Sequence, residues 1–156
     1  MNIDMKRKIR VVTIVLMLIY MMVLAYVCFF SERYGRVVSD THHYNLQPFR
    51  EISRFYIYRK LIGVKAFIIN LFGNILAFVP FGFMVSILWQ GRHQVIDAVF
   101  CTFLLSLVVE VIQFVFKVGS FDVDDLILNT CGGFLGVIIY QTVNVIRRKI
   151  FGKAGL

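Results

Sequence analysis

The sequence predicts an all-α integral membrane protein, a bundle of four transmembrane helices with a basic, aromatic-rich loop between the first and second helices. The 156 residues are 59% hydrophobic and only 17% charged, and a mean hydropathy of +0.78 is too high for an ordinary soluble domain. Four segments are almost without charge, namely 11–30, 66–89, 98–116 and 126–146. Each is close to the ~20 residues that a helix needs to cross a bilayer. Their unbroken apolar runs lack the alternating pattern of a membrane β-barrel.

The segment 11–30 is expected to be a retained helix rather than a cleaved signal peptide. The basic stretch MKRKIR precedes it, as in many signal peptides. However, its apolar run is too long, and no small-residue cleavage site follows Phe30. The chain's 3 cysteines, Cys28, Cys101 and Cys131, all fall within predicted spans. We expect them to pack as small side chains rather than to form disulfides or bind a metal.

Basic residues flank the predicted bundle and account for part of the net charge of +8. Four spans put both tails on one side, and the positive-inside rule then predicts cytoplasmic tails and no role for the charge in nucleic-acid binding. The basic tail residues are Lys6, Arg7, Lys8, Arg10, Arg147, Arg148, Lys149 and Lys153. The first loop, 31–65, is also basic, which opposes this orientation. Its basic residues are Arg33, Arg36, Arg50, Arg54, Arg59, Lys60 and Lys65.

Local sequence signals predict how the segments begin, end and pack. No repeat or linker divides the chain, so residues 1–156 are predicted to form a single membrane domain. Pro48 favours a short interfacial helix through FREISRFYIYRKL, with an irregular loop as the alternative. Pro80 is expected to bend or break the second span. The stretch QGRHQVID predicts a tight hairpin, and Gly132 with Gly136, beside Gly133, predicts close helix packing.

Polar side chains at membrane depth are predicted to gather at one end of the bundle. Each later span carries two polar residues three or four positions apart, which therefore share a helical face. The pairs are Asn70 with Asn74, Glu110 with Gln113, and Asp125 with Asn129. Up-down connectivity places all three pairs on the side where the first loop opens, with His42, His43 and Asn45. Ionisable groups at this depth usually face a bundle interior, a partner or a cavity.

The residues leave several roles open at this predicted site. Asp122 is expected to cap the fourth helix, and Asp124 and Asp125 suit its first turn through the macrodipole. The asparagines alternatively hydrogen-bond between helices. Glu110 requires either a cationic partner, with Arg50 or Arg54 as candidates, or protonation. The D-x-D-D pattern is only weakly typical of a metal site, so no metal and no cofactor are predicted.

Four stretches in order resemble the VanZ-like family of bacterial membrane proteins, which is named for a teicoplanin-resistance determinant. They are NLQPF (45–49), NLFGNILAFVPFGF (70–83), EVIQF (110–114) and DVDDLILNTCGGFLG (122–136). The chain departs from the commoner family pattern at Gln47, where an aliphatic residue is usual, and at Ser120, near which an arginine is common. The family-pattern positions are Asn45, Pro48, Phe49, Asn70, Gly73, Asn74, Pro80, Gly82, Glu110, Gln113, Asp122, Asp125, Asn129 and Gly133.

The resemblance implies a multi-pass protein of the bacterial cell membrane, with some relatives lowering susceptibility to teicoplanin and related lipoglycopeptides. The leading hypothesis is that the polar site, at the outer membrane face, binds an anionic lipid headgroup, another envelope lipid, a cell-wall precursor or a partner protein. Its candidate residues are Asn45, Arg50, Arg54, Asn70, Asn74, Glu110, Gln113, Asp122, Asp124, Asp125 and Asn129. An enzyme acting on a lipid-linked envelope intermediate is the alternative. A small transporter or an assembly subunit, functioning as a homo-oligomer or with a membrane partner, is the third hypothesis.

Overall fold

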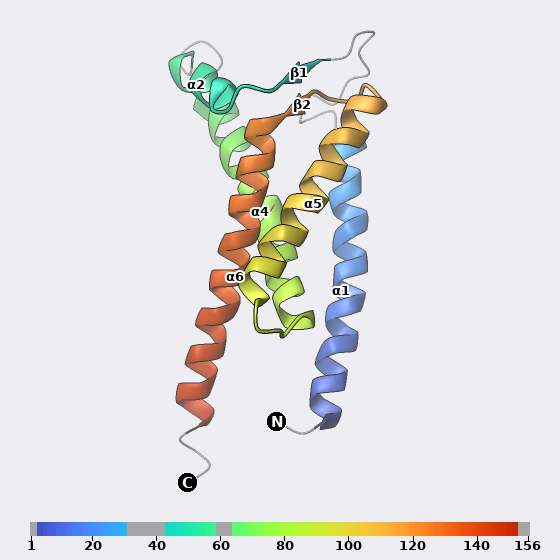
Figure 1. The fold of residues 1–156 in the computed structure, drawn as a ribbon, viewed down its shortest axis with the longest axis vertical. Helices are drawn as coiled ribbons and strands as arrows, with labels where there is room; N and C mark the ends of the chain where they lie inside the picture. Colours follow the sequence, from blue (N-terminus) through green and yellow to red (C-terminus); the bar gives the residue numbers. More distant parts are fainter. Residues whose placement is uncertain (1–2, 31–42, 59–63, 153–156) are drawn as a thin grey trace.

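The computed structural model describes residues 3–30, 43–58 and 64–152, and it shows four long helices beneath a small cap (Figure 1). In chain order the elements are α1 (Ile3–Phe30), β1 (Tyr44–Asn45), α2 (Arg50–Ile57), α4 (Val64–Leu88), α5 (Gln94–Val115), β2 (Phe121–Asp122) and α6 (Val123–Phe151). Within the described residues, the four long helices are sufficiently long and apolar to cross a membrane. The predicted all-α, four-helix membrane fold is therefore confirmed.

The start of α1 and the end of α6 lie at the end of the bundle opposite the cap (Figure 1). Helices α4 and α5 are joined by residues 89–93 alone, so the predicted tight hairpin is confirmed. Two small apolar clusters hold the helices together. One contains Leu24, Phe78 and Val109, and the other contains Val85 and Val137. Most other large apolar side chains of the long helices face outward, as lipid contact requires.

Glycines allow α4 and α6 to approach until backbone meets backbone. A Cβ atom at Gly132 would collide with the carbonyl group of Ile75, and one at Gly136 would collide with that of Val79. Gly82 of α4 has the same relation to the backbone of Gly133. The G-x-x-x-G pair therefore does pack against a neighbouring helix, and that helix is α4.

Pro80 does not break the second span, because α4 continues through it to Leu88. Proline lacks an N–H and disturbs the carbonyl groups of the turn before it. A neighbouring helix adds a hydrogen bond within this turn: the hydroxyl of Tyr20 in α1 donates to the carbonyl oxygen of Ala77 at 2.7 Å. Hydrogen bonds from neighbouring helices are among the adjustments that let membrane helices tolerate proline.

The cap consists of a short helix and a two-residue parallel strand pair. Tyr44 pairs with Phe121, and Asn45 pairs with Asp122. The short interfacial helix was predicted, and it begins at Arg50, two residues after Pro48. The strand pair was not predicted, because two residues are too few for a hydropathy pattern. Residues 31–42 and 59–63 of the predicted basic loop lie outside the described residues, and they include Arg33, Arg36, His42, Arg59 and Lys60.

Candidate functional site

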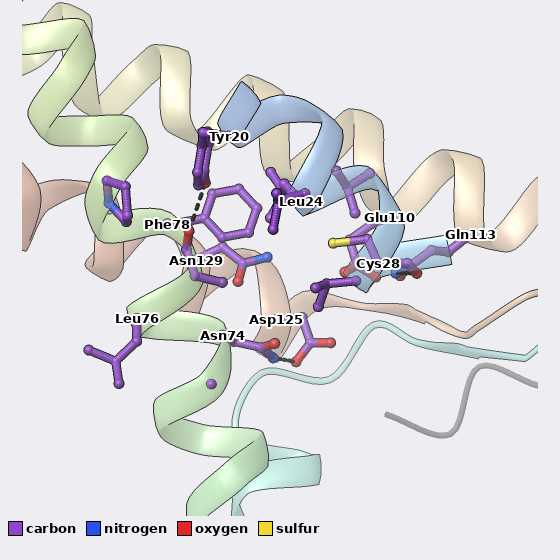
Figure 2. A pocket seen from close by; sticks show the side chains of 16 residues that line it. Tyr20, Leu24, Cys28, Asn74, Leu76, Phe78, Glu110, Gln113, Asp125 and Asn129 are labelled. Atoms are coloured by element: carbon purple, nitrogen blue, oxygen red, sulfur yellow. Dashed lines mark hydrogen bonds between the residues drawn. The ribbon is translucent and has the colours of Figure 1, made fainter. Parts of the chain in front are cut away.

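A cavity of about 440 Å³ lies between the four long helices at the depth of their polar residues (Figure 2). Most of its wall is apolar and comes from α1 and α4, with Leu24, Leu76 and Phe78 among the lining residues. Five predicted site residues line it together, namely Asn74, Glu110, Gln113, Asp125 and Asn129. Residues from three different helices thus form one polar end, as the connectivity argument anticipated.

The other predicted site residues are not among those that line the cavity. Asn70 lies one turn before Asn74 on α4 and is half-buried. Asn45, Arg50, Arg54, Asp122 and Asp124 belong to the cap and its junction with α6. The predicted site therefore divides into a cavity group and a cap group.

Asp125 joins α6 to α4 at the polar end of the cavity. The side-chain amide of Asn74 donates a hydrogen bond to its carboxylate (Figure 2). Asn129 lies one turn further along α6, and its Nδ2 donates to the hydroxyl oxygen of Ser106 at 2.9 Å. Asn129 is 3% exposed, and its Oδ1 has no hydrogen-bond partner among the described residues.

Glu110 and Gln113 project from α5, and each is only 1% exposed. The carboxylate of Glu110 accepts the backbone N–H of Asp122 at 3.0 Å, which ties the end of α5 to the start of α6. Nε2 of Gln113 donates to the carbonyl oxygen of Cys28 at 2.9 Å, which ties α5 to α1. The Oε1 atom of Gln113 is buried without a partner in the part of the chain that the structure describes.

Asp122 is the N-cap of α6, as predicted. Its carboxylate accepts the backbone N–H of Asp124 at 2.9 Å and the side-chain amide of Asn45 at 3.1 Å. Asn45 in turn accepts the backbone N–H of Gln47 at 3.2 Å, which shapes the turn before α2. Burial raises the pKa of the Asp122 carboxyl, and its hydrogen bonds from Asp124 and Asn45 oppose that rise. Asn45 and Asp122 therefore connect the first loop to α6.

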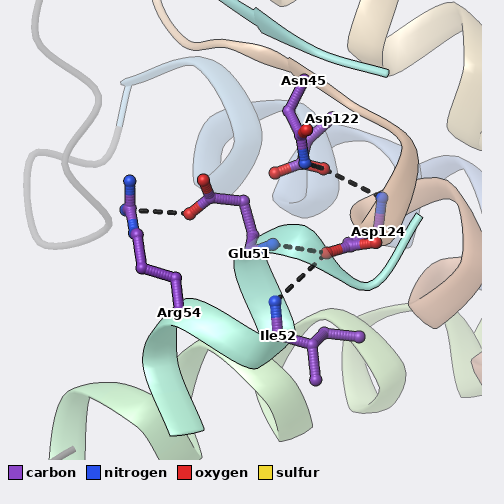
Figure 3. Close-up of polar contacts among 6 residues, drawn as sticks. All are labelled: Asn45, Glu51, Ile52, Arg54, Asp122 and Asp124. Carbon is purple, nitrogen blue, oxygen red and sulfur yellow. Dashed lines mark hydrogen bonds and ion pairs between the residues drawn. The ribbon is translucent and has the colours of Figure 1, made fainter. Parts of the chain in front are cut away.

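Asp124 lies in the first turn of α6 but caps a different helix, α2 (Figure 3). Its carboxylate accepts backbone N–H groups from Phe49, from Glu51 at 2.8 Å and from Ile52 at 3.1 Å. Phe49 is the N-cap of α2, yet its own side chain forms no capping hydrogen bond, and its φ of 64° is left-handed. Asp124 supplies the acceptor that the start of α2 lacks.

The described ion pair of Arg54 is with Glu51 on the same helix, at 2.8 Å (Figure 3). Burial raises the pKa of Glu51, while Arg54 lowers it and the nearby Asp122 and Asp124 raise it further. Arg50 is exposed. Pairing of Glu110 with Arg50 or Arg54 stays a prediction.

A VanZ/LLP1 family model matches residues 17–146, which is most of the chain. The chain belongs to the VanZ-like family. The VanZ protein of Enterococcus faecium is 30% identical over 132 residues, covering 83% of this chain and 73% of that protein. No solved structure matches. Because the cavity and the cap both lie within the matched residues, they belong to the part of this VanZ-like protein that its family shares.

Three features of the VanZ-like site were missed at the level of sequence. Tyr20 lines the cavity and bonds to α4, but a single tyrosine in an apolar run gives no signal. The partnership of Asp124 with α2 spans more than 70 positions and has no local pattern. Ser106 was detectable, because it stands four residues before Glu110 and seven before Gln113 on one helical face.

In the described ranges, no group of three or more His, Cys, Asp or Glu side chains is placed to hold a metal ion. The carboxylates of the D-x-D-D stretch point to three different sets of partners, namely Asn45 with the start of α6, the start of α2, and Asn74. Next to its apolar wall, the cavity thus offers carboxyl and amide groups that can form hydrogen bonds with a bound molecule.

Proposed function

We propose that this VanZ-like protein holds an amphiphilic envelope molecule, a membrane lipid or a lipid-linked cell-wall precursor, in the cavity. By doing so it lowers susceptibility to teicoplanin and related lipoglycopeptides. The observation that carries the proposal is the joining of an apolar wall to a small polar end inside one membrane-depth cavity. The apolar wall suits a lipid chain, and the buried polar groups suit its head.

The proposed location is the bacterial cell membrane, with the cavity end facing outward. The start of α1 and the end of α6 lie at the opposite end of the bundle (Figure 1), and the last turn of α6 carries Arg148 and Lys149. Cytoplasmic tails satisfy the positive-inside rule in this arrangement. A cysteine introduced at Ser39 tests the orientation, because a membrane-impermeant reagent added outside the cell should label it. A cysteine that the reagent does not label would contradict the proposed orientation.

Gly73 offers a direct test of the cavity. It lines the cavity, and a Cβ atom there would meet no atom within 4 Å. Gly73→Leu therefore fills the cavity without a backbone collision. In a teicoplanin-susceptible host, we expect the wild-type chain to raise the inhibitory concentration and Gly73→Leu to lose that effect at equal protein level.

Gly91→Leu is the matched control for that experiment. Gly91 lies in the α4–α5 hairpin, and a Cβ atom there meets its nearest neighbours at 3.4 Å or more. We expect this variant to behave as wild type. Full resistance with Gly73→Leu would show that the cavity is not needed for resistance. If the wild-type chain itself leaves the inhibitory concentration of teicoplanin unchanged, the proposed link to teicoplanin is wrong.

A second candidate function is an enzyme that acts on a lipid-linked envelope intermediate. It is favoured by the presence of two carboxyl groups, Glu110 and Asp125, in the same cavity. Deletion should then change the profile of lipid-linked intermediates, with rescue by wild type but not by Glu110→Gln. An unchanged profile would leave binding as the function.

A further inference from the structure

Hydrogen-bond acceptors dominate the polar end of the cavity. Glu110 and Asp125 contribute carboxylates, which when ionised can only accept hydrogen bonds. Gln113 contributes its buried, unpartnered Oε1. The orientation of this amide is fixed, because its Nε2 faces the carbonyl oxygen of Cys28 and a carbonyl oxygen cannot donate.

Each amide group near this end already uses one of its two N–H donors within the protein. Asn74 donates to Asp125, Gln113 donates to Cys28, and Asn129 donates to Ser106. The donation by Asn129 leaves its Oδ1 as a further buried acceptor. Among the described residues that line the cavity, none is Lys, Arg or His.

Charge and hydrogen bonding therefore oppose direct contact between an anionic group and the two carboxyl groups, and favour a cationic donor in contact with them. A phosphate or carboxylate would add acceptors and negative charge beside the two carboxyl groups. A primary ammonium instead supplies three N–H donors and a positive charge. The buried acceptors of Gln113 and Asn129 would then gain the partners that buried polar atoms normally have. Positive charge is available to an anionic group at the exposed Arg50 and Arg54 of α2.

We propose, on the basis of the cavity function proposed above, that the ligand is a lipid with a primary ammonium head. The ammonium is held by Glu110, Asp125 and Gln113, and the apolar part lies along the wall that includes Leu24 and Phe78. Its N–H groups form charge-assisted hydrogen bonds to the carboxylates, which are stronger than neutral ones. The ligand class that we propose is an aminophospholipid.

Native mass spectrometry of the purified full-length protein tests the inference with three lipids that share the same acyl chains. Phosphatidylethanolamine has a primary ammonium, phosphatidylcholine keeps the positive charge but has no N–H donor, and phosphatidylglycerol has no ammonium. We expect phosphatidylethanolamine to bind about tenfold more tightly than either of the others. Equal binding of phosphatidylcholine, or preference for phosphatidylglycerol, would overturn the aminolipid assignment.

Variants test whether the two carboxyl groups of the cavity cause the preference for phosphatidylethanolamine. Glu110→Gln combined with Asp125→Asn should bring phosphatidylethanolamine and phosphatidylcholine to nearly equal affinity. Asp97→Asn is the control, because Asp97 is an acidic residue in the first turn of α5, at the other end of the bundle. It should keep the preference. A double variant that keeps the full preference would overturn the proposed role of the carboxylates, and if the double variant does not fold, the three-lipid comparison in wild type decides.

Gly73→Leu separates this inference from the function on which it rests. If wild type binds lipid that Gly73→Leu excludes, but with a different head preference, only the aminolipid inference fails. If wild type and Gly73→Leu bind all three lipids equally, the cavity is not a lipid site and the proposed function fails with it.

Discussion

Helix α4 has two unlike faces, and the difference separates what holds the protein together from what is available to a ligand. On the side of α6, Gly132 and Gly136 leave no room for even a methyl group against the α4 backbone. On the side of α1, Gly73 opens onto the cavity with no atom within 4 Å. Glycine thus serves opposite purposes at the two faces of α4: glycines of α6 allow close packing against one face, and Gly73 of α4 itself leaves open space at the other.

The most direct test of this difference is the same substitution at a packed glycine of α6 and at the open glycine of α4. Gly132→Leu should destabilise the protein by about 3 kcal/mol, because the side chain would meet backbone that cannot move aside. Gly73→Leu should leave the free energy of unfolding unchanged or raise it by up to ~1 kcal/mol, since it removes a helix-interior glycine. Unfolding in detergent measures both, and equal losses would refute the distinction.

The next largest effect on stability is expected from a substitution in the cap. Asp124→Asn keeps the size of the side chain but removes the charge that accepts backbone N–H groups of α2. Hydrogen bonds to a charged group are typically worth ~1.5–3 kcal/mol, so the amides of Glu51 and Ile52 should exchange hydrogen much faster. Glu51→Gln is the control, because it leaves the same backbone N–H in place. Unchanged protection in Asp124→Asn would show that α2 is held by other contacts.

Removing the hydrogen bond between α1 and α4 should lower the stability by a smaller amount. Tyr20→Phe removes the hydroxyl that donates to Ala77 near Pro80, and interhelical hydrogen bonds in membranes average ~0.6 kcal/mol. Tyr26→Phe is the matched control, since Tyr26 lies on the same helix and is 63% exposed. Thermal unfolding in detergent should show a loss only in Tyr20→Phe. A similar loss in both variants would mean that the Ala77 contact is not the cause.

The smallest expected effect is a pH dependence of stability from the cap. The pKa values of Asp122 and Glu51 are raised in the folded protein, mainly by burial. Their contribution to stability is therefore fully present below their unfolded pKa values and is lost as the pH rises through the folded ones. The stability of wild type relative to Asp122→Asn/Glu51→Gln should fall over that range. A constant difference between the two proteins would contradict the raised values.

The residues show why the fold was more predictable than the site. Four long apolar runs predict four helices with little ambiguity, because each hydrophobic run reports directly on its own lipid surroundings. Asp125 and Asn129 were correctly associated with Glu110, because helical spacing and up-down connectivity constrain depth. The partners of Asp122 and Asp124 were harder to predict. An aspartate at the start of α6 can cap α6 itself, as Asp122 does, or the start of another helix, as Asp124 does, and the sequence looks the same in both cases.

Hydropathy, helical spacing and connectivity are thus enough to predict the bundle, its polar end and the N-cap of α6, since these depend on local patterns along single helices. Three-dimensional contacts assign the three neighbouring aspartates to Asn45, to the start of α2 and to Asn74. They also decide which glycine packs a helix and which opens a cavity. The physical reason is that both outcomes depend on what a distant segment places opposite the residue, and no local pattern records that neighbour.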